Sequence, residues 1–147
     1  MYKYNYDGIF CELTISIEDQ LSIQDLISRQ NCLLDNGNIE AWLETWADDG
    51  ILEATYGRAT GKHELKELMT NLYEDFMSDK KHITSNLVID GNESTASCSS
   101  YLTVFEAKKT PSVVASGTYY DEFKKINGKW KFVLRHLKID LVDENKN

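Results

Sequence analysis

Four long strands in succession fill the sequence from residue 82 onward, and this run constrains the fold more than any other feature. A turn at Gly91, a bend at Pro111 and the pair Asn127-Gly128 separate the strands, and an Asn-Gly pair is a strong hairpin signal. The strands are predicted at residues 82–90, 94–106, 113–125 and 130–141. Such an antiparallel meander needs cover on one face, which the first half of the chain must supply.

Helical periodicity in the first half of the chain indicates that helices cover this face of the sheet. Ser16 resembles the first residue of a capping box, and apolar residues recur at helical spacing after it. A second helix is predicted after Asn38, with Trp42 and Trp46 on its apolar face. The first helix, a short strand and a third helix are predicted at about residues 17–34, 51–56 and 65–76. The sequence therefore predicts an α+β domain in which a curved sheet wraps on helices.

Length, charge and cysteine content narrow the class of protein. The chain of 147 residues fits one domain, predicted at 16–142, with an N-terminal arm at 1–15 and a polar tail at 143–147. A formal charge of -8 would repel a phosphate backbone, so we expect neither nucleic acid nor a membrane as partner. No segment is apolar enough for a membrane span or a leader peptide, and a cytoplasmic, soluble protein is expected.

The cysteines are odd in number, widely separated and without metal-ligand or redox spacing. This pattern fits a reducing compartment, and we interpret Cys11, Cys32 and Cys98 as buried or semi-buried thiols.

Polar residues at inward positions are the first candidates for a site. His82, Thr84 and Asn86 alternate along a predicted strand and therefore share one face. Gln30 lies within the apolar stripe of the first helix. A two-residue turn at Gly91 would place His82 opposite Tyr101, with Phe105 on the same face, whereas a three-residue turn would reverse this pairing.

The second hairpin extends the same face. If Asn127-Gly128 is a two-residue turn, Phe123 pairs with Phe132 and Tyr119 with His136, and Asp121 lies between them on the face of Tyr119. These alternations predict one cavity with His82, Tyr101, Tyr119 and Asp121 among its walls.

Each candidate also has an ordinary interpretation. His82 could be a core histidine bonded to Tyr101, and Asp121 could form a salt bridge with Arg135. Asp35, at the end of a helix, could simply form a turn, and Trp46 could belong to the core.

At these residues the chain resembles the nuclear transport factor 2-like superfamily, and within it the SnoaL-like, polyketide cyclase-like group. The resemblance covers roughly residues 17–140, and the order of its segments carries it. These segments are DLISRQNCLLDNGNIEAW, TWADDGIL, YGRATGK, KHITSN, TASCSSYLTVF, SGTYYDEF and INGKWKFVLRHLKID. The resemblance implies a cone of three helices against a strongly bent, antiparallel or mixed sheet, usually in a dimer or trimer.

Enzymes of this group include dehydratases, ketosteroid isomerases, epoxide hydrolases and polyketide cyclases, which perform acid-base chemistry inside the cone. His82 matches the histidine of scytalone and bile-acid dehydratase-like enzymes, and Asp35 matches their helix-end aspartate. The chain departs from them at Gln30, where those enzymes tend to have tyrosine, and at Phe105, where the scytalone type has a second histidine. The alternative is a noncatalytic role that resembles the small subunit of ring-hydroxylating dioxygenases.

The expected site therefore combines His82 and Asp35 as the catalytic pair of a lyase or isomerase that needs no cofactor and no metal. The ligand is expected to be a small hydrophobic or polycyclic molecule. The residues expected to bind it are Gln30, Trp46, Asn86, Tyr101, Phe105, Tyr119 and Asp121. Self-association, as a dimer or trimer, is expected through an outer sheet face that carries Val88, Val104, Val113 and Val133.

Overall fold

A computed structural model of the chain describes residues 15–106 and 110–142, so nearly all of the predicted arm, the predicted tail and Cys11 lie outside the described residues. Its helical elements are α1 (Ile17–Asp35), α2 (Ile39–Leu43), α3 (Gly61–Leu72) and the π-helical turn η1 (Tyr73–Met77). Its strands are β1 (Trp46–Ala54), β2 (Gly57–Thr60), β3 (Lys80–Gly91), β4 (Thr95–Glu106), β5 (Ser112–Ile126) and β6 (Lys129–Val142).

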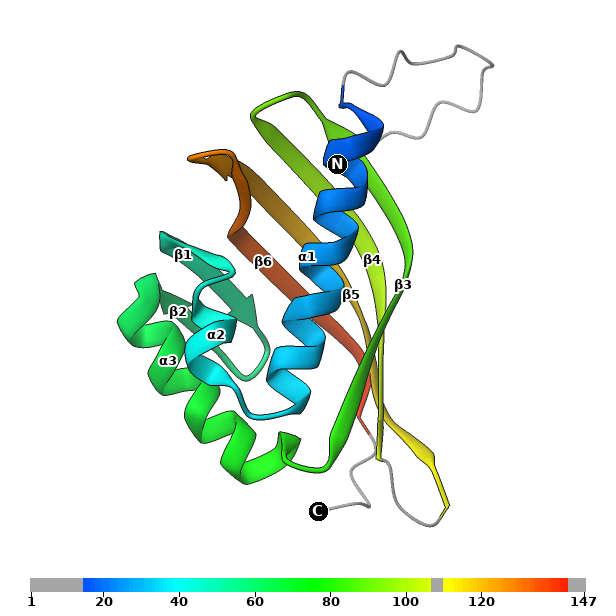
Figure 1. Ribbon diagram of the computed structural model, residues 1–147. Coiled ribbons are helices and arrows are strands. Elements are labelled where there is room, and N and C mark those ends of the chain that lie inside the picture. Colours follow the sequence, from blue (N-terminus) through cyan, green and yellow to red (C-terminus); the bar gives the residue numbers. More distant parts are fainter. Residues whose placement is uncertain (1–14, 107–109, 143–147) are drawn as a thin grey trace.

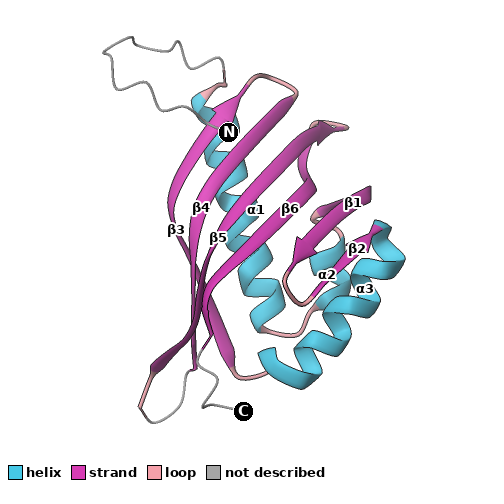
Figure 2. Cartoon of the chain, turned by 180° about the vertical axis from the view of Figure 1, so that it is seen from behind, coloured by secondary structure: helices cyan, strands magenta, loops and turns pink. Residues whose placement is uncertain are grey.

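The strands form one curved sheet in the order β2-β1-β6-β5-β4-β3, in which only the β1–β6 pair among the described residues is parallel. All helices lie on one face of this sheet, and α1 crosses the long strands diagonally (Figure 1). Seen from behind, the opposite face carries none of the described helices (Figure 2). The predicted α+β class and the helical cover of a bent sheet are confirmed.

The first helix begins and ends close to where the sequence predicts. The Ser16 side chain accepts a hydrogen bond from the backbone N–H of Asp19 at 3.1 Å, which satisfies a donor that the first turn leaves without a partner. The helix continues one residue beyond the predicted end, to Asp35, and Gly37 then takes the left-handed conformation, with φ of +69°, that turns the chain toward α2. Asp35 is thus the last residue of α1, beside the sheet.

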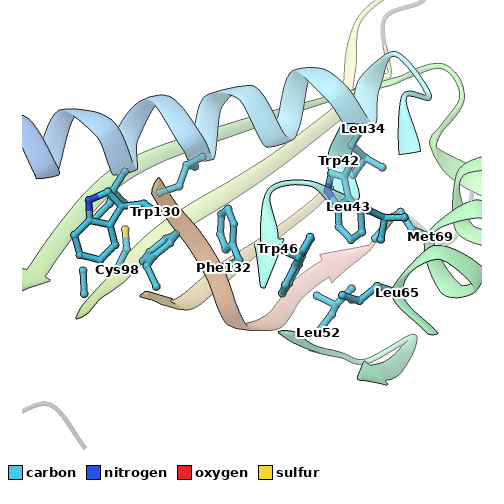
Figure 3. Packing of buried hydrophobic residues seen from close by; sticks show 14 of the residues in the cluster. Leu34, Trp42, Leu43, Trp46, Leu52, Leu65, Met69, Cys98, Trp130 and Phe132 are labelled. Carbon is cyan, nitrogen blue, oxygen red and sulfur yellow. The ribbon is translucent and has the colours of Figure 1, made fainter. Parts of the chain in front are cut away.

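The predicted length of the second helix is wrong, because α2 ends at Leu43 and Trp46 begins strand β1. The cause is long-range pairing. The backbone N–H of Phe132 donates to the carbonyl of Thr45 at 3.0 Å, and Trp46 pairs in parallel with Phe132 of β6. Figure 3 shows Trp46 between Trp42 and Phe132, and each of these two rings has its centroid 5.4 Å from that of Trp46. This aromatic stack favours the strand over one more helical turn.

Strand β3 contains an irregularity that the sequence analysis did not anticipate. Next to the hairpin loop, Gly91 pairs with Ala96. An odd-numbered residue of β3 thus faces an even-numbered residue of β4 there, as predicted. Between Ser85 and Val88, however, β3 holds one extra residue, and Asn86 takes a φ of +54° there. A bulge of this kind changes which residues share a face on either side of it.

The predicted pairing of His82 with Tyr101 is wrong for two reasons: the loop after Gly91 is longer than the expected two-residue turn, and the bulge shifts the register by one residue. As a result, His82 pairs with Val104 and Tyr101 pairs with Ser85. Tyr101 therefore lies on the outer face with 56% of its surface exposed, and Val104 is buried on the inner face. The prediction that Val104 belongs to an outer association surface is wrong for the same reason. Val88 and Val113 are exposed, and self-association through that face stays a prediction.

The second hairpin agrees more closely with the prediction. Phe123 pairs with Phe132 as expected, whereas a register shift after Phe123 pairs Tyr119 with Leu137 instead of His136. Tyr119 and Asp121 are nevertheless both buried, because the shift adds a residue to β6 and leaves the alternation of β5 unchanged.

The two cysteines among the described residues differ in environment. Cys98 is buried, as predicted, and this burial raises the pKa of its thiol to about 12, with a further contribution from the charge of Asp121. Cys32 lies exposed on α1, contrary to the prediction, because it projects from the side of the helix that faces away from the sheet. None of the described helices is long and apolar enough to span a lipid bilayer.

Candidate functional site

His82 and Asp35 form a buried pair where the C-terminal end of α1 meets the start of β3. Nδ1 of His82 lies 2.6 Å from Oδ1 of Asp35, and the backbone N–H of His82 donates to Oδ2 of the same carboxylate at 3.1 Å. Both side chains are almost fully buried. The carboxylate therefore holds the histidine through both its ring and its backbone, which fixes the orientation of the imidazole.

The next inward residue of β3 is also held by α1. The amide of Asn31 donates to the hydroxyl of Thr84 at 2.8 Å. His82 and Thr84 share a face as predicted, and their partners Asp35 and Asn31 lie one turn apart on the helix. This polar row anchors α1 to the sheet.

His82 lines a small cavity of about 50 Å³ between the helices and the sheet. Nδ1 is occupied by Asp35, and no other residue within the described ranges bonds Nε2. Three further polar side chains line the cavity, namely Tyr56, Tyr119 and Arg135. The rest of the wall is apolar and includes Trp42, Leu52, Met69, Phe76, Met77 and Leu102. A ligand in this cavity would therefore meet one free imidazole nitrogen and a few polar groups within an apolar surround.

Tyr119 is buried, and no hydrogen bond to its hydroxyl is found in the part of the chain that the structure describes. Burial raises the pKa of Tyr119, the positive charge of Arg135 opposes this change, and the charges of Asp121 and Asp35 add to it. The hydroxyl therefore stays protonated near neutral pH and remains available as a hydrogen-bond donor.

A second buried cluster lies next to the first, and its hydrogen bonds form a chain. The guanidinium of Arg135 donates from Nε and Nη2 to the two oxygens of Asp121, at 2.7 and 2.8 Å, and from Nη1 to the amide oxygen of Gln30. The Gln30 amide donates to Thr45 at 3.0 Å, and the Thr45 hydroxyl donates to the carbonyl of Trp42 at 2.6 Å. Each buried polar group in this chain thus provides a hydrogen-bond partner for the next one.

This cluster explains why Gln30 points inward. Gln30 is 1% exposed, as its helical position predicts, but its amide oxygen and nitrogen are both used by protein partners. Asp121 forms the salt bridge with Arg135 that was the ordinary interpretation of that residue. Neither Gln30 nor Asp121 belongs to the cavity wall. Burial raises the pKa of Asp121, and the charge and hydrogen bonds of Arg135 act in the opposite direction.

Arg135 connects the two clusters. Its guanidinium carbon lies 3.9 Å from the centroid of the Tyr119 ring and 4.6 Å from that of Phe132. The sequence analysis considered Arg135 only as a partner for Asp121. Alternation counted backward from Leu137 would have placed it on the inner face, because Arg135 lies two residues before that buried leucine.

Besides Gln30 and Asp121, four further residues that were expected to bind ligand lie away from the cavity. Tyr101 is on the outer face, Phe105 is half-buried opposite Lys81, and Asn86 is exposed in the bulge of β3. Trp46 is buried in the aromatic stack. Tyr56 was not predicted and does line the cavity, because β1 turns into β2 beside it. Across residues 15–106 and 110–142, no three His, Cys, Asp or Glu side chains gather closely enough to hold a metal ion.

The fold and the family match define the class of protein, an α+β domain of the nuclear transport factor 2-like superfamily. The chain belongs to the SnoaL-like domain family, whose members it matches over residues 16–136. A comparison with curated proteins finds no match.

Three solved structures place the fold among known proteins. A protein of unknown function with a cystatin-like fold from Nostoc punctiforme is 36% identical with a TM-score of 0.82, covering 86% of this chain and 94% of that one. A nuclear transport factor 2-like protein from Novosphingobium aromaticivorans is 24% identical with a TM-score of 0.76, covering 84% and 82%. A putative scytalone dehydratase from the same organism is 22% identical with a TM-score of 0.74, covering 84% and 85%.

Proposed function

We propose that this protein binds a small molecule in the cavity beside His82 and transfers a proton on it without a cofactor, as a lyase or isomerase. The observation that supports this proposal is the buried Asp35–His82 pair, with Nδ1 held at 2.6 Å and Nε2 left for the cavity. The resemblance to dehydratase-like members of the superfamily and the likeness in fold to a putative scytalone dehydratase agree with it.

The pair has the geometry of a general base with a positioning partner. Asp35 accepts the Nδ1 hydrogen and so selects the tautomer in which Nε2 carries a lone pair. Nε2 then removes a proton from the carbon next to a ligand carbonyl, and the negative charge of Asp35 stabilises the imidazolium that forms. Asp35 acts through His82 and is a positioning residue.

The released electron pair moves onto the carbonyl oxygen, and the resulting enolate needs a donor. Tyr119 lines the same cavity, has a protonated hydroxyl and lacks a protein acceptor among the described residues. In a dehydration, a β-hydroxyl then leaves as water with the proton that His82 returns. In an isomerisation, His82 returns the proton to another carbon.

The volume of the cavity bears on the size of the ligand. Pockets for drug-sized ligands span roughly 300–1,000 Å³. The cavity of about 50 Å³ therefore fits the small hydrophobic ligand of the initial expectation better than the polycyclic one.

The alternative is a noncatalytic binding role, and one observation favours it. Phe105 stands where scytalone-type enzymes have a second histidine, and His82 is the single histidine among the described residues of the cavity wall. A site with one proton-handling imidazole is a weaker acid-base catalyst than a site with two.

Exchange of α-protons for deuterium distinguishes these roles. Small ketones and β-hydroxy ketones incubated with the protein in D2O are followed by proton NMR. The proposal expects exchange or elimination that is lost in His82→Gln and kept in His63→Gln, because His63 is exposed on α3 and remote from the cavity. Ligand binding without any exchange would support the noncatalytic role.

A further inference from the structure

The cavity wall, as described, contains no acidic side chain, although the protein as a whole is acidic. The chain has 24 acidic residues against 16 basic ones, yet no carboxylate belongs to the described cavity wall. The four polar groups on the wall are an arginine, a histidine and two tyrosines, all of which can donate hydrogen bonds. Asp35 and Asp121 bond to His82 and Arg135 without lining the cavity themselves.

The Asp121–Arg135 pair is oriented with its positive end at the cavity. The side chain of Asp121 is fully buried and both of its oxygens accept from Arg135, while the guanidinium reaches the cavity wall. A guanidinium carries five N–H groups, of which Asp121 and Gln30 take three in this structure. Two N–H groups of Arg135 therefore have no protein acceptor among the described residues, and the guanidinium that carries them stacks on the ring of Tyr119.

We propose that this cavity selects small aliphatic carboxylates, and that Arg135 is the residue that recognises their charge. The apolar remainder of the wall fits a short hydrocarbon body, whereas the remaining N–H groups of Arg135 and the hydroxyl of Tyr119 supply donors to the carboxylate oxygens. This inference rests on the cavity of the proposed function and names its substrate class, but it does not require catalysis.

The same wall should bind positively charged and neutral ligands less tightly than carboxylates. An ammonium group needs acceptors, and a carboxylate that could provide them is absent from the described wall. A neutral amide can accept from Arg135, but it forms weaker, uncharged hydrogen bonds and must leave its own N–H groups beside other donors. The expected order of affinity is therefore carboxylate, then amide, then ammonium.

Methionine methyl signals report binding directly. Met69 and Met77, two of the three methionines in the chain, line the cavity, so methyl-13C methionine labelling places two NMR probes at the site. Titration with isobutyrate, isobutyramide and isobutylammonium compares three charges on one branched body. We expect isobutyrate to bind about tenfold or more tightly than isobutyramide. An isobutyrate affinity no greater than that of isobutyramide, or no binding of either, overturns the inference.

A paired variant tests the role of Arg135 itself. The double variant Arg135→Met with Asp121→Leu removes both charges, so no buried carboxylate is left without a partner. It is expected to lose the preference for isobutyrate. The matched control, Arg29→Met with Asp25→Leu, removes an exposed ion pair on α1 and should keep the preference. Retention in the double variant would contradict the inference, and if that variant fails to fold, the ranking of the three ligands on the unaltered protein decides.

The variant His82→Gln separates this inference from the proposed function. It should abolish proton exchange while the preference for isobutyrate remains, because Arg135 and its partners do not bond to His82. Carboxylate preference without exchange would leave the inference standing and reject the catalytic proposal. Proton exchange without carboxylate preference would support the catalytic proposal and reject the inference about carboxylates.

Discussion

Two buried clusters lie side by side under α1, and each is built around an aspartate paired with a basic side chain. In the Arg135 cluster, the carboxylate of Asp121 and the amide oxygen of Gln30 accept from Arg135. The Gln30 amide donates to Thr45, whose hydroxyl donates to the backbone. In the His82 cluster, both carboxylate oxygens of Asp35 bond to His82, and His82 lines the cavity with Nε2 unbonded among the described residues. Both clusters thus reach the cavity, but only the imidazole nitrogen can take up a proton, because the N–H groups of Arg135 can only donate.

Because of that difference, we expect the Arg135 cluster to contribute mainly to stability and the His82 cluster mainly to proton transfer. A polar network with few unused atoms holds α1, β5 and β6 in register, and its loss leaves buried groups without partners. A network with one unused atom at a cavity can exchange a proton with a ligand. Substitutions in the Arg135 cluster should therefore act on unfolding free energy and, at Arg135 itself, on carboxylate preference, whereas those in the His82 cluster should act mainly on turnover.

The largest effect on stability is expected from Arg135→Met alone. It leaves the carboxylate of Asp121 buried without its partner, and such losses cost about 3–5 kcal/mol of unfolding free energy. Urea denaturation measures the change, and the double variant with Asp121→Leu should recover most of it. A loss for Arg135→Met as small as that for the exposed Arg29→Met would show that the buried cluster does not stabilise the fold.

Asp35→Asn is expected to act on turnover and not on stability. The asparagine oxygen can still accept from the backbone N–H of His82, but its amide donates to Nδ1 and moves the ring hydrogen to Nε2. We expect proton exchange to fall by about 10²–10⁴-fold. The 15N shifts of the imidazole check the change of tautomer, and a reversed tautomer with unchanged exchange would remove His82 from the role of base.

Gln30→Leu tests whether the amide serves the protein or a ligand. The leucine leaves an N–H of Arg135 without its acceptor and removes the hydrogen bond that Thr45 accepts, although the Thr45 hydroxyl still donates to the carbonyl of Trp42. The lost bonds should cost about 1–3 kcal/mol of unfolding free energy. Thermal melts measure it, with Gln24→Leu on the exposed side of α1 as the control. Isobutyrate affinity should change little. A weaker affinity at unchanged stability would instead place Gln30 in the ligand site.

The smallest effect on stability is expected from Asp19→Asn, which alters a partly exposed ion pair with Lys125. Asp19 accepts from Lys125 and from the indole of Trp130, and these hydrogen bonds hold the pKa of Asp19 below its usual value. We expect a loss of about 0.5–1 kcal/mol near pH 7.

The pH dependence of that loss follows from the direction of the shift. Because the pKa of Asp19 is lower in the folded state, its contribution is complete above the pKa of the unfolded chain and disappears as the pH falls through the lower folded value. Urea titrations of both proteins from pH 7 to pH 2 should therefore converge. A difference that stays constant with pH would assign the effect to packing around Trp130.

The sequence by itself determined those features that depend on neighbouring residues. Helical spacing placed Gln30 inside and brought Asp35 to the end of α1, and the alternation of β5 placed Tyr119 and Asp121 on the inner face. The order of segments also indicated the superfamily. The inward positions depend on a period of 3.6 or 2 residues within one element, and the resemblance depends on the order of the segments along the chain.

Only the tertiary structure decided how distant segments meet. The bulge at Asn86 moved Tyr101 outward and brought Val104 opposite His82, and the parallel pairing with β6 drew Trp46 out of a helix. One extra residue in a strand reverses every side chain beyond it, and its position depends on what packs against both faces. The contact between Arg135 and Gln30 joins residues 105 positions apart, so no local period can predict it.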